Sequence, residues 1–355
     1  MPGSGDPPRA ASPRPPAAAA GAGRPVVTVV CADDRPPGMT PVEEHAEVRY
    51  VSSRKLPECF AETDVLFLWD FLSRAVPASW SEPNRLRWLH VAAAGVDNVL
   101  CGRLRSSDVV VTNSRGVFDE PVAEYVLGLV LAFVKDLPGT LTAQAGRTWR
   151  HRETERLAGR TALVIGTGPI GRATGRLLRA AGLRVAGIGR TGRAADPDLG
   201  TIHPFGELTR WLPEADFVIA AAPLTPQTEG MINSRTLAAM RPGARLINVG
   251  RGGLVVTGDL VAALRAGRIA GAALDVFETE PLPPASPLWT LPGVIISPHM
   301  AGDAAGWAQA LAALFADNFL RWRGGRPLRN VVDKCLGYVP GGPDGGPESP
   351  RREAG

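Results

Sequence analysis

Residues 161–182, TALVIGTGPIGRATGRLLRAAG, decide the fold. The stretch opens with an apolar run at 161–166 and continues at 169–182 with apolar residues at helical spacing. A glycine-rich segment joins the two, in the order strand, turn and helix. The stretch therefore predicts a unit that binds a dinucleotide, with a ligand-free tight turn as the alternative.

Three glycines in this segment, Gly166, Gly168 and Gly171, form the pattern GxGxxG. Gly166 permits a tight turn, Gly168 lets a pyrophosphate approach the backbone, and Gly171 lets the helix pack closely on the strand. Pro169 and Ile170 open the helix, whose first N–H groups and positive dipole end favour phosphate. We expect all five residues to contact the cofactor.

Apolar strands alternate with helices on both sides of this unit. Strands are predicted at 26–30, 65–69, 86–91, 109–112, 161–166, 183–188, 216–222, 244–250, 268–276 and 293–298, and helices at 120–137, 169–182, 258–267 and 304–323. Strands that are apolar throughout and followed by helices are typical of a parallel sheet covered on both faces. The fold class is therefore α/β with two domains.

The predicted cofactor domain, a doubly wound Rossmann domain, spans 116–302. It is inserted in a smaller, flavodoxin-like α/β substrate domain formed by 26–115, to which a helix within 303–335 returns. Residues 1–25 and 336–355 are rich in Pro, Ala and Gly and are predicted to be a disordered arm and a disordered tail.

Composition restricts the possible partners and location. The net charge of +4 is spread thinly over 355 residues without a basic run, which argues against nucleic acid. The four cysteines are isolated, so we expect reduced thiols and neither a disulfide framework nor a metal site. Without a predicted signal peptide or membrane-spanning segment, we expect a cytoplasmic protein with no membrane partner.

The end of the second strand of the unit indicates which dinucleotide binds. An NAD site has a carboxylate there for the ribose 2′-OH, but Gly189 stands at this position and Arg190, Thr191 and Arg193 follow. Two guanidinium groups and a hydroxyl suit a 2′-phosphate. The segment favours NADP, with NAD possible and an unliganded basic loop as the other reading.

Three ionisable residues, Arg251, Glu280 and His299, follow predicted strands and so lie at the carboxyl edge of the sheet, where such folds bind ligands. An arginine can anchor a 2-oxo acid by its carboxylate, and a histidine can protonate the oxygen that gains charge. A neighbouring glutamate favours the charged histidine. We predict that these three residues are catalytic.

At this point the chain resembles the D-isomer-specific 2-hydroxyacid dehydrogenase family. The similarity runs from about 88 to 302 and includes AAGVDN (93–98), GVFDEPVAEYVLGLVL (116–131), AAPLTPQTEGMIN (221–233), LINVGRGGLV (246–255), AALDVFETEPL (272–282) and SPHMAG (297–302). The resemblance implies an NADP-preferring reductase that converts a 2-oxo acid such as glyoxylate or hydroxypyruvate to a D-2-hydroxy acid. It also implies a homodimer.

The resemblance assigns roles by position. Arg251 is the substrate-binding arginine, Glu280 the partner of the histidine, and His299 the proton donor. The substrate contacts are Ala94, Gly95, Arg251 and His299, and further cofactor contacts are Ala222, Pro223, Thr228, Val249, Gly250, Asp275 and Gly302. Asp275 resembles the aspartate that contacts the nicotinamide carboxamide.

Three alternatives stay open. A phosphoglycerate dehydrogenase-like activity shares the motifs, but a regulatory domain is common after the catalytic region of those enzymes and none is predicted here. A co-repressor-like protein that senses dinucleotide shares the fold, although Arg190 and Arg193 argue against an NADH sensor. The third alternative is a dinucleotide-binding protein without activity.

Overall fold

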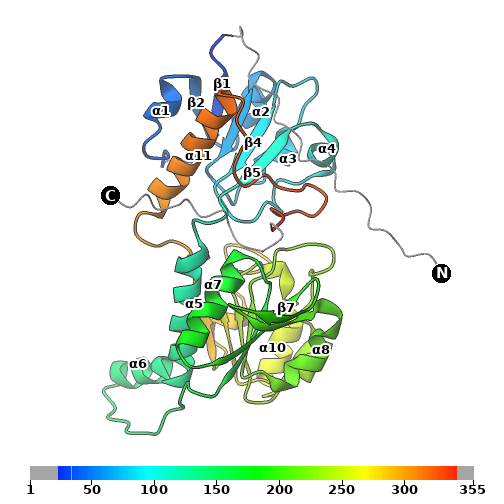
Figure 1. The fold of residues 1–355 in the computed structure, drawn as a ribbon. Helices are drawn as coiled ribbons and strands as arrows, with labels where there is room; N and C mark the ends of the chain where they lie inside the picture. Colours follow the sequence, from blue (N-terminus) through cyan, green and yellow to red (C-terminus); the bar gives the residue numbers. More distant parts are fainter. Residues whose placement is uncertain (1–22, 33, 342–355) are drawn as a thin grey trace, which may run out of the picture. The chain divides into compact units, whose positions relative to one another are not determined.

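The computed structural model describes residues 23–32 and 34–341, which belong to two compact units (Figure 1). Of the described residues, unit 1 contains 23–32 and 34–92 together with Asn98–Asn113 and Ala308–Val332, and unit 2 contains Ala93–Asp97, Ser114–Trp307 and 333–341. These bounds differ from the predicted 26–115, 116–302 and 303–335. The five residues Ala93–Asp97 group with unit 2, where Ser114 donates a backbone hydrogen bond to Ala93 (2.9 Å).

Unit 1 contains a five-stranded parallel sheet. Its strands are β1 (Val26–Val30), β2 (Glu47–Val51), β3 (Val65–Leu68), β4 (Trp88–Val91) and β5 (Val110–Asn113). The strand order is β2-β1-β3-β4-β5, and all four pairings are parallel. The order 2-1-3-4-5 is that of flavodoxin-like folds, which confirms the predicted architecture of this unit.

Helices cover the sheet of unit 1. They are α1 (Thr40–Glu43), α2 (Leu56–Cys59), α3 (Ala75–Ser79), α4 (Gly102–Ser106) and α11 (Trp307–Arg323). The returning helix α11 packs its apolar face on the sheet: the ring of Phe315 stacks on Phe67, with centroids 4.0 Å apart, and on Trp88, at 5.2 Å. Burying three aromatic rings together removes a large apolar area from water.

Unit 2 contains an eight-stranded sheet. Its strands are β6 (Thr161–Ile165), β7 (Arg184–Gly189), β8 (Arg193–Asp196), β9 (Gly200–Pro204), β10 (Phe217–Ala220), β11 (Arg245–Asn248), β12 (Gly271–Leu274) and β13 (Val294–Ile296). The order is β13-β12-β11-β10-β6-β7-β9-β8, parallel except for β8 with β9. If β8 is left out and the strands are numbered from β6 in chain order, the sheet reads 3-2-1-4-5-6-7 from β9 to β13. This is the Rossmann order 3-2-1-4-5-6 with one added strand, so the predicted doubly wound fold is confirmed.

The helices of unit 2 lie on both faces of this sheet (Figure 1). They are α5 (Asp119–Val134), α6 (Leu137–Ala145), α7 (Pro169–Ala180), α8 (Leu208–Trp211), α9 (Ser234–Ala239) and α10 (Thr257–Arg265). One apolar cluster contains residues of β6, β10 and β11 with those of α9 and α10, and a second contains other residues of the same strands with those of α5 and α7. A sheet buried on both faces accounts for the continuous apolar runs of its strands.

Strands β2, β8 and β9 were not predicted from the sequence. β2 and β8 are edge strands with sequences EVRYV and RAAD, and their residues are mostly half-buried or exposed. Edge strands face solvent along one side and carry charged residues, so they lack the apolar run that marks a central strand.

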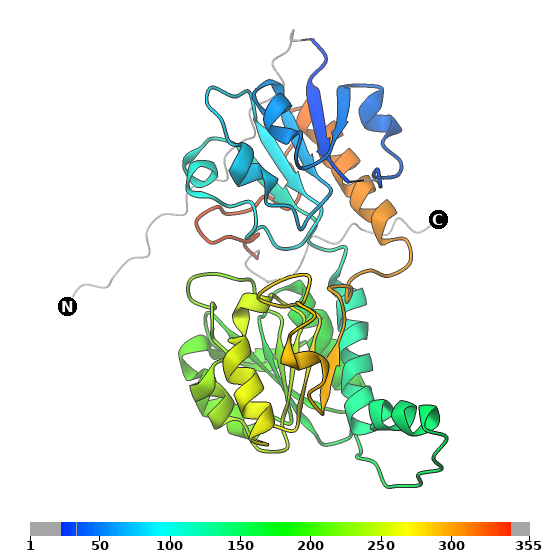
Figure 2. The same ribbon diagram turned by 180° about the vertical axis from the view of Figure 1, so that it is seen from behind.

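The helix predicted at 120–137 is wrong in its extent. α5 ends at Val134, Asp136 takes a left-handed conformation (φ 46°), and α6 begins at Leu137. The carboxylate of Asp136 accepts the Gly139 N–H (3.1 Å), so Asp136 caps a new helix. α6 and the chain that follows it project from the rest of unit 2 (Figure 2).

Both predicted disordered ends need partial correction. Pro25 accepts a backbone hydrogen bond from Glu47, and Arg24 donates to the carbonyl of Ala46 (2.9 Å), so 23–25 belong to the fold. Of residues 336–341, placed in the predicted tail, 336–338 form part of a hydrogen-bonded turn capped by Asp333. The remaining 1–22 and 342–355 lie outside the described residues.

Within the described ranges, no helix taken alone has the length and apolar character to span a membrane. One bent pair, α5 with α6, reaches that threshold jointly, by length and composition only, across a 65° bend.

Candidate active site

The glycine-rich turn after β6 has the local geometry that its sequence predicts. Gly166 has φ +113°, and a Cβ there would lie 2.6 Å from the carbonyl oxygen of Ala221. A Cβ on Gly171 would overlap the carbonyl of Gly166. Gly168 is the N-cap of α7, and a Cβ there would meet no atom within 4 Å. Gly166 and Gly171 are therefore required by close backbone contacts within the protein. Gly168 instead borders open space.

That open space fits the pyrophosphate of a dinucleotide. Helix α7 begins with Pro169 and Ile170. The N–H groups in the first turn of a helix have no backbone carbonyl to bond within the helix, so they point out of its N-terminus. Because Gly168, the N-cap of this helix, has no side chain, an anion can approach the backbone closely there. The turn therefore fits the cofactor that its sequence predicts.

The end of β7 has no room for a side chain at Gly189. A Cβ there would lie 2.9 Å from Cγ2 of Thr167 and 3.1 Å from Cγ2 of Ile202. Beyond it, Arg190 and Thr191 are exposed, and Nη1 of Arg190 donates to the hydroxyl of Tyr338 (2.7 Å). At the position where an NAD site has its carboxylate, a side chain would therefore have to displace Thr167 or Ile202. The next residue, Arg190, supplies a guanidinium group.

Arg193, the second predicted phosphate-binding arginine, contacts a carboxylate. Its Nη1 lies 3.2 Å from Oδ2 of Asp196, which is buried and also binds Arg172 (2.8 Å). Burial opposes ionisation of Asp196, but the Leu199 N–H and the Arg172 guanidinium outweigh it and hold the pKa of this carboxyl below its usual value. Arg193, whose side chain is 45% exposed, therefore shares this carboxylate with Arg172.

Arg251 lies directly beyond the end of β11, where it precedes a short 3-10 helix, Gly252–Leu254. The buried side chain of Asn248 fixes this loop, since its amide donates to the Arg251 carbonyl (2.9 Å) and accepts the Gly250 N–H (3.2 Å). Sequence reasoning did not single out Asn248, although it lies in the quoted segment LINVG.

The guanidinium of Arg251 is held by Asp97 and packs on Gly95. Nε of Arg251 donates to Oδ1 of Asp97 (2.9 Å), and Nη1 donates to the carbonyl of Gly250 (3.0 Å). A Cβ on Gly95 would overlap Nη2 of Arg251, so the absence of a side chain lets the guanidinium lie against the backbone beside Ala94. Arg251 therefore lies beside the predicted substrate-binding amides, held by an aspartate that sequence reasoning gave no role.

Glu280 and His299 form a hydrogen-bonded pair within this same unit. Nδ1 of His299 lies 2.7 Å from Oε2 of Glu280, and Oε1 of Glu280 accepts the Phe277 N–H (2.8 Å). Burial opposes the charge on Glu280, but His299, the Phe277 N–H and the charge of Arg251 hold its pKa below the ordinary value. Because Arg251 and His299 both act on Glu280, the structure brings the three predicted residues into one cluster.

Asp275 organises the loop that carries His299. Its carboxylate accepts the hydroxyl of Ser297 (2.6 Å) and the N–H groups of Met300 (2.9 Å) and Ala301 (3.0 Å). The Asp275 carbonyl accepts the His299 N–H (2.8 Å), and His299 has a left-handed backbone (φ 56°). The structure thus gives this buried aspartate a positioning role, and the predicted contact with the nicotinamide carboxamide stays a prediction.

The other predicted contacts also follow strand ends. Thr228 donates its hydroxyl to the carbonyl of Pro223 (2.7 Å), which stabilises the turn that follows Ala222 after β10. The Val249 N–H bonds the carbonyl of Ala220 (3.1 Å), which continues the ladder beyond β11. A Cβ on Gly302 would lie 2.6 Å from the ring of Phe118, so this glycine is required by packing. These positions border the carboxyl edge of the sheet, and their contacts with the cofactor stay predictions.

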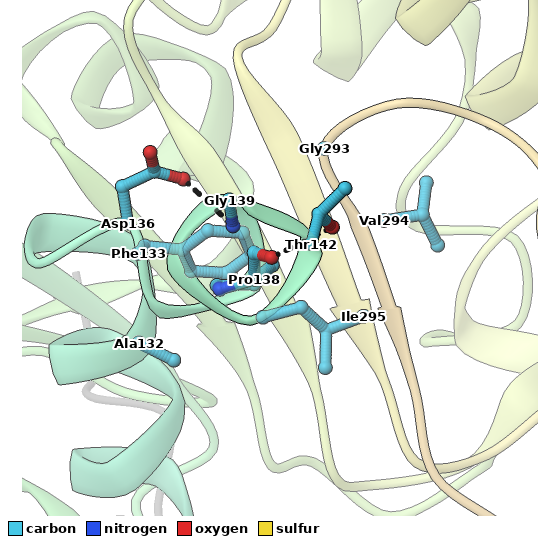
Figure 3. Close-up of a pocket in the computed structure, with 9 residues that line it drawn as sticks. All are labelled: Ala132, Phe133, Asp136, Pro138, Gly139, Thr142, Gly293, Val294 and Ile295. Atoms are coloured by element: carbon cyan, nitrogen blue, oxygen red, sulfur yellow. Dashed lines mark hydrogen bonds between the residues drawn. The ribbon is translucent and has the colours of Figure 1, made fainter. Parts of the chain in front are cut away.

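A separate cavity of about 290 Å³ lies between the end of α5, α6 and β13 (Figure 3). Phe133, Pro138, Thr142 and Ile295 are among the residues that line it, and the carboxylate of Asp136, which also lines it, accepts the Gly139 N–H. Neither Arg251, Glu280 nor His299 borders this cavity.

A Rossmann sheet with a glycine-rich turn and an Arg–Glu–His cluster beyond its carboxyl edge defines the class of dinucleotide-dependent dehydrogenases. Residues 127–301 match the model of the D-isomer specific 2-hydroxyacid dehydrogenase, NAD binding domain. A glyoxylate reductase of Thermococcus gammatolerans is 32% identical over 311 residues, which cover 84% of this chain and 92% of the relative. The chain therefore belongs to the D-isomer specific 2-hydroxyacid dehydrogenase family, as its motifs predicted.

Two solved structures extend the similarity to the whole fold. A D-isomer specific 2-hydroxyacid dehydrogenase from Xanthobacter autotrophicus, in complex with NADPH and MES, is 31% identical with a TM-score of 0.76, covering 89% of this chain and 100% of that one. An NADPH-dependent glyoxylate/hydroxypyruvate reductase from Sinorhizobium meliloti, in complex with NADP and malonate, is 29% identical with a TM-score of 0.77, covering 90% and 99%.

Proposed function

We propose that this protein is an NADPH-dependent reductase that converts a small 2-oxo acid, of the glyoxylate or hydroxypyruvate kind, to the D-2-hydroxy acid. The observation that carries the proposal is the 2.7 Å contact between His299 and Glu280, in the same unit where Arg251 is held by Asp97 against the backbone of Gly95. The same chemistry is printed for the glyoxylate reductase and the NADPH-dependent glyoxylate/hydroxypyruvate reductase to which this chain is similar.

In the proposed reaction each residue of the cluster has one task. Arg251, oriented by Asp97, binds the substrate carboxylate together with the backbone amides of Ala94 and Gly95. His299 protonates the oxygen of the reacting carbonyl, and because Nδ1 is held by Glu280 we assign this proton to Nε2. Glu280 keeps the imidazole oriented through the hydrogen bond at Nδ1. NADPH, when bound, supplies the hydride.

The preference for NADPH rests on the end of β7. A carboxylate cannot be accommodated at Gly189 without displacing Thr167 or Ile202, and Arg190 stands beside the site with a neutral partner. A guanidinium at this place favours a 2′-phosphate over a 2′-hydroxyl. Of the two arginines, Arg190 is the better candidate, because Arg193 is directed to the carboxylate of Asp196, 3.2 Å away, whereas Arg190 contacts a neutral phenol.

A panel of 2-oxo acids assayed with NADPH and NADH in parallel tests the proposal. We expect reduction of glyoxylate and hydroxypyruvate with higher kcat/KM for NADPH. The hydroxypyruvate product should be D-glycerate on a chiral column, since glycolate has no stereocentre. Oxidation of 3-phosphoglycerate in preference to these reactions would select the phosphoglycerate dehydrogenase alternative. If the protein bound the cofactor but reduced none of the acids, the alternatives without enzymatic activity, a dinucleotide sensor or a dinucleotide-binding protein, would be favoured.

We also propose that two copies pair through the projecting part of unit 2. Leu141 of α6 and Trp149 beyond it are exposed (64% and 98%), and α6 has no charged residue. Apolar side chains on a projecting element favour burial against a partner. A second copy presents the same surface, so a two-fold contact satisfies both chains at once.

Light scattering with size-exclusion chromatography tests this assembly. We expect a dimer for the natural chain and a monomer for Leu141→Glu and Trp149→Glu. Leu320→Glu, which changes an exposed leucine on α11 of unit 1, is the matched control and should stay dimeric. A natural chain that elutes as a monomer at every concentration contradicts the pairing.

A further inference from the structure

A tight turn near the end of the described chain places Tyr338 in unit 2. The Asp333 N–H donates to the Tyr338 carbonyl (3.1 Å), and the Gly337 N–H donates to the Asp333 carbonyl (2.8 Å). Oδ1 of Asp333 accepts the N–H groups of Cys335 (2.8 Å) and Leu336 (3.0 Å). Gly337, at φ 81°, takes the left-handed conformation that the turn requires. The turn is therefore a folded element with its own cap.

The chain beyond the turn is also tied to unit 2. Nη1 of Arg115, at the start of the segment that leads to α5, donates to the carbonyl of Val339 (3.0 Å) and also contacts that of Pro340 (3.4 Å). Charge-assisted hydrogen bonds to backbone carbonyls hold a segment in one register. Tyr338 is thus fixed from both sides, by Asp333 before it and by Arg115 after it.

The hydroxyl of Tyr338 reaches the end of β7. It accepts a hydrogen bond from Nη1 of Arg190 at 2.7 Å. Because an arginine only donates, the phenol must be the acceptor, and its own proton remains to be donated to another acceptor. A phenol is also neutral, so Arg190 keeps its full charge, whereas Arg193 faces the carboxylate of Asp196.

We propose that Tyr338 is a cofactor-specificity residue that binds the 2′-phosphate of NADP together with Arg190. Tyr338 orients the guanidinium through the observed hydrogen bond and donates its phenolic proton to a phosphate oxygen. The phosphate accepts both donors, and a 2′-hydroxyl, being smaller and uncharged, gains little from either. This inference rests on the proposed function, since it concerns the cofactor of the same site.

Calorimetric binding of two fragments, 2′,5′-ADP and 5′-AMP, to the full-length chain tests the inference without a catalytic readout. For Tyr338→Phe we expect the Kd of 2′,5′-ADP to rise about tenfold, the effect of losing one hydrogen bond to a charged group. The Kd of 5′-AMP should be unchanged. Tyr50→Phe, which removes a hydroxyl bonded to Glu43 in unit 1, is the matched control and should change neither value.

A double-mutant cycle with Arg190→Ala separates binding from simple support of the fold. If both residues bind the phosphate, adding Tyr338→Phe to the Arg190→Ala variant should raise the Kd of 2′,5′-ADP by much less than tenfold, because the two side chains act together. Equal weakening of both fragments by Tyr338→Phe, or no weakening of either, would overturn the inference while leaving the proposed reductase intact. A natural chain that binds 5′-AMP as tightly as 2′,5′-ADP overturns the inference together with the NADPH preference.

Discussion

Nδ1 of His299 lies 2.7 Å from Oε2 of Glu280, although the two residues belong to loops that follow different strands, β12 and β13. The second carboxylate oxygen of Glu280 is held by the Phe277 N–H, and the His299 N–H is held by the Asp275 carbonyl. Both members of the pair are thus anchored to the backbone. The imidazole is presented in one orientation, as a proton donor requires.

The first prediction concerns proton transfer. His299→Gln should lower kcat by about 10²–10⁴-fold, the usual contribution of a general acid. Binding of NADPH should be unchanged, because the turn that we expect to hold its pyrophosphate, Gly166–Gly171, lies in another loop of unit 2 and is left intact. Steady-state kinetics and fluorescence titration with NADPH measure the two effects. A variant with near-normal kcat would remove His299 from the proposed mechanism.

The second prediction concerns stability against pH. The pKa of Glu280 is lowered from its ordinary value of 4.5, so its interactions stabilise the fold fully above that value and are lost as the pH falls through the lowered pKa. We expect the natural chain to melt at a higher temperature than Glu280→Gln at neutral pH, with a smaller difference in acid.

Thermal melts of both chains from neutral pH down to well below 4.5 check this expectation. The same comparison in the His299→Gln background is the control, and it should show a smaller dependence on pH because one of the interactions that lower the pKa is already absent. A melting difference that stays constant into acid would contradict the lowered pKa.

The third prediction concerns Gly95. An alanine there would place a Cβ where Nη2 of Arg251 lies, so the guanidinium must move while its charge is kept. We expect Gly95→Ala to raise the KM for glyoxylate at least tenfold, about 1.4 kcal/mol. Gly243→Ala is the control, since a Cβ at Gly243 meets no atom within 4 Å. Equal kinetics for the two variants would show that the packing on Gly95 does not matter.

The fourth prediction concerns Asp97, which we regard as a positioning residue for Arg251. Asp97→Ala removes the acceptor for Nε and should raise the KM for the 2-oxo acid about tenfold, since a hydrogen bond to a charged group contributes ~1.5–3 kcal/mol. Asp97→Asn keeps an oxygen acceptor and removes the charge that competes with the substrate carboxylate. It should therefore have a KM near that of the natural chain.

Kinetics of the two Asp97 variants with saturating NADPH distinguish orientation from charge. If alanine and asparagine raise the KM equally, the charge of Asp97 matters and its hydrogen bond does not. A change confined to the thermal midpoint, with KM unaffected in both variants, would show that Asp97 serves only the fold.

Several features could be predicted because they depend on residues near one another in the chain. The glycine-rich unit at 161–182 combines a strand, a turn and a helix cap, and each has its own local requirement. Arg251, Glu280 and His299 could be found because each follows a strand of one parallel sheet, whose carboxyl ends share an edge.

Other features could not be predicted because their partners lie far away in the sequence. Asp97 and Arg251 are separated by 154 residues and Arg190 and Tyr338 by 148, and no local pattern links either pair. The polar edge strands β2 and β8 likewise depend on a neighbouring strand for their hydrogen bonds.

The sequence by itself determined the α/β class, the dinucleotide turn and the identity of the three ionisable residues, since these follow from apolar periodicity and from the conformations open to glycine. Only the tertiary structure decided how Arg251 is held, that Arg193 faces a carboxylate while Arg190 bonds a phenol, and that residues 333–341 belong to unit 2. The physical reason is that a charge is tuned by its neighbours in space, and folding alone selects those neighbours.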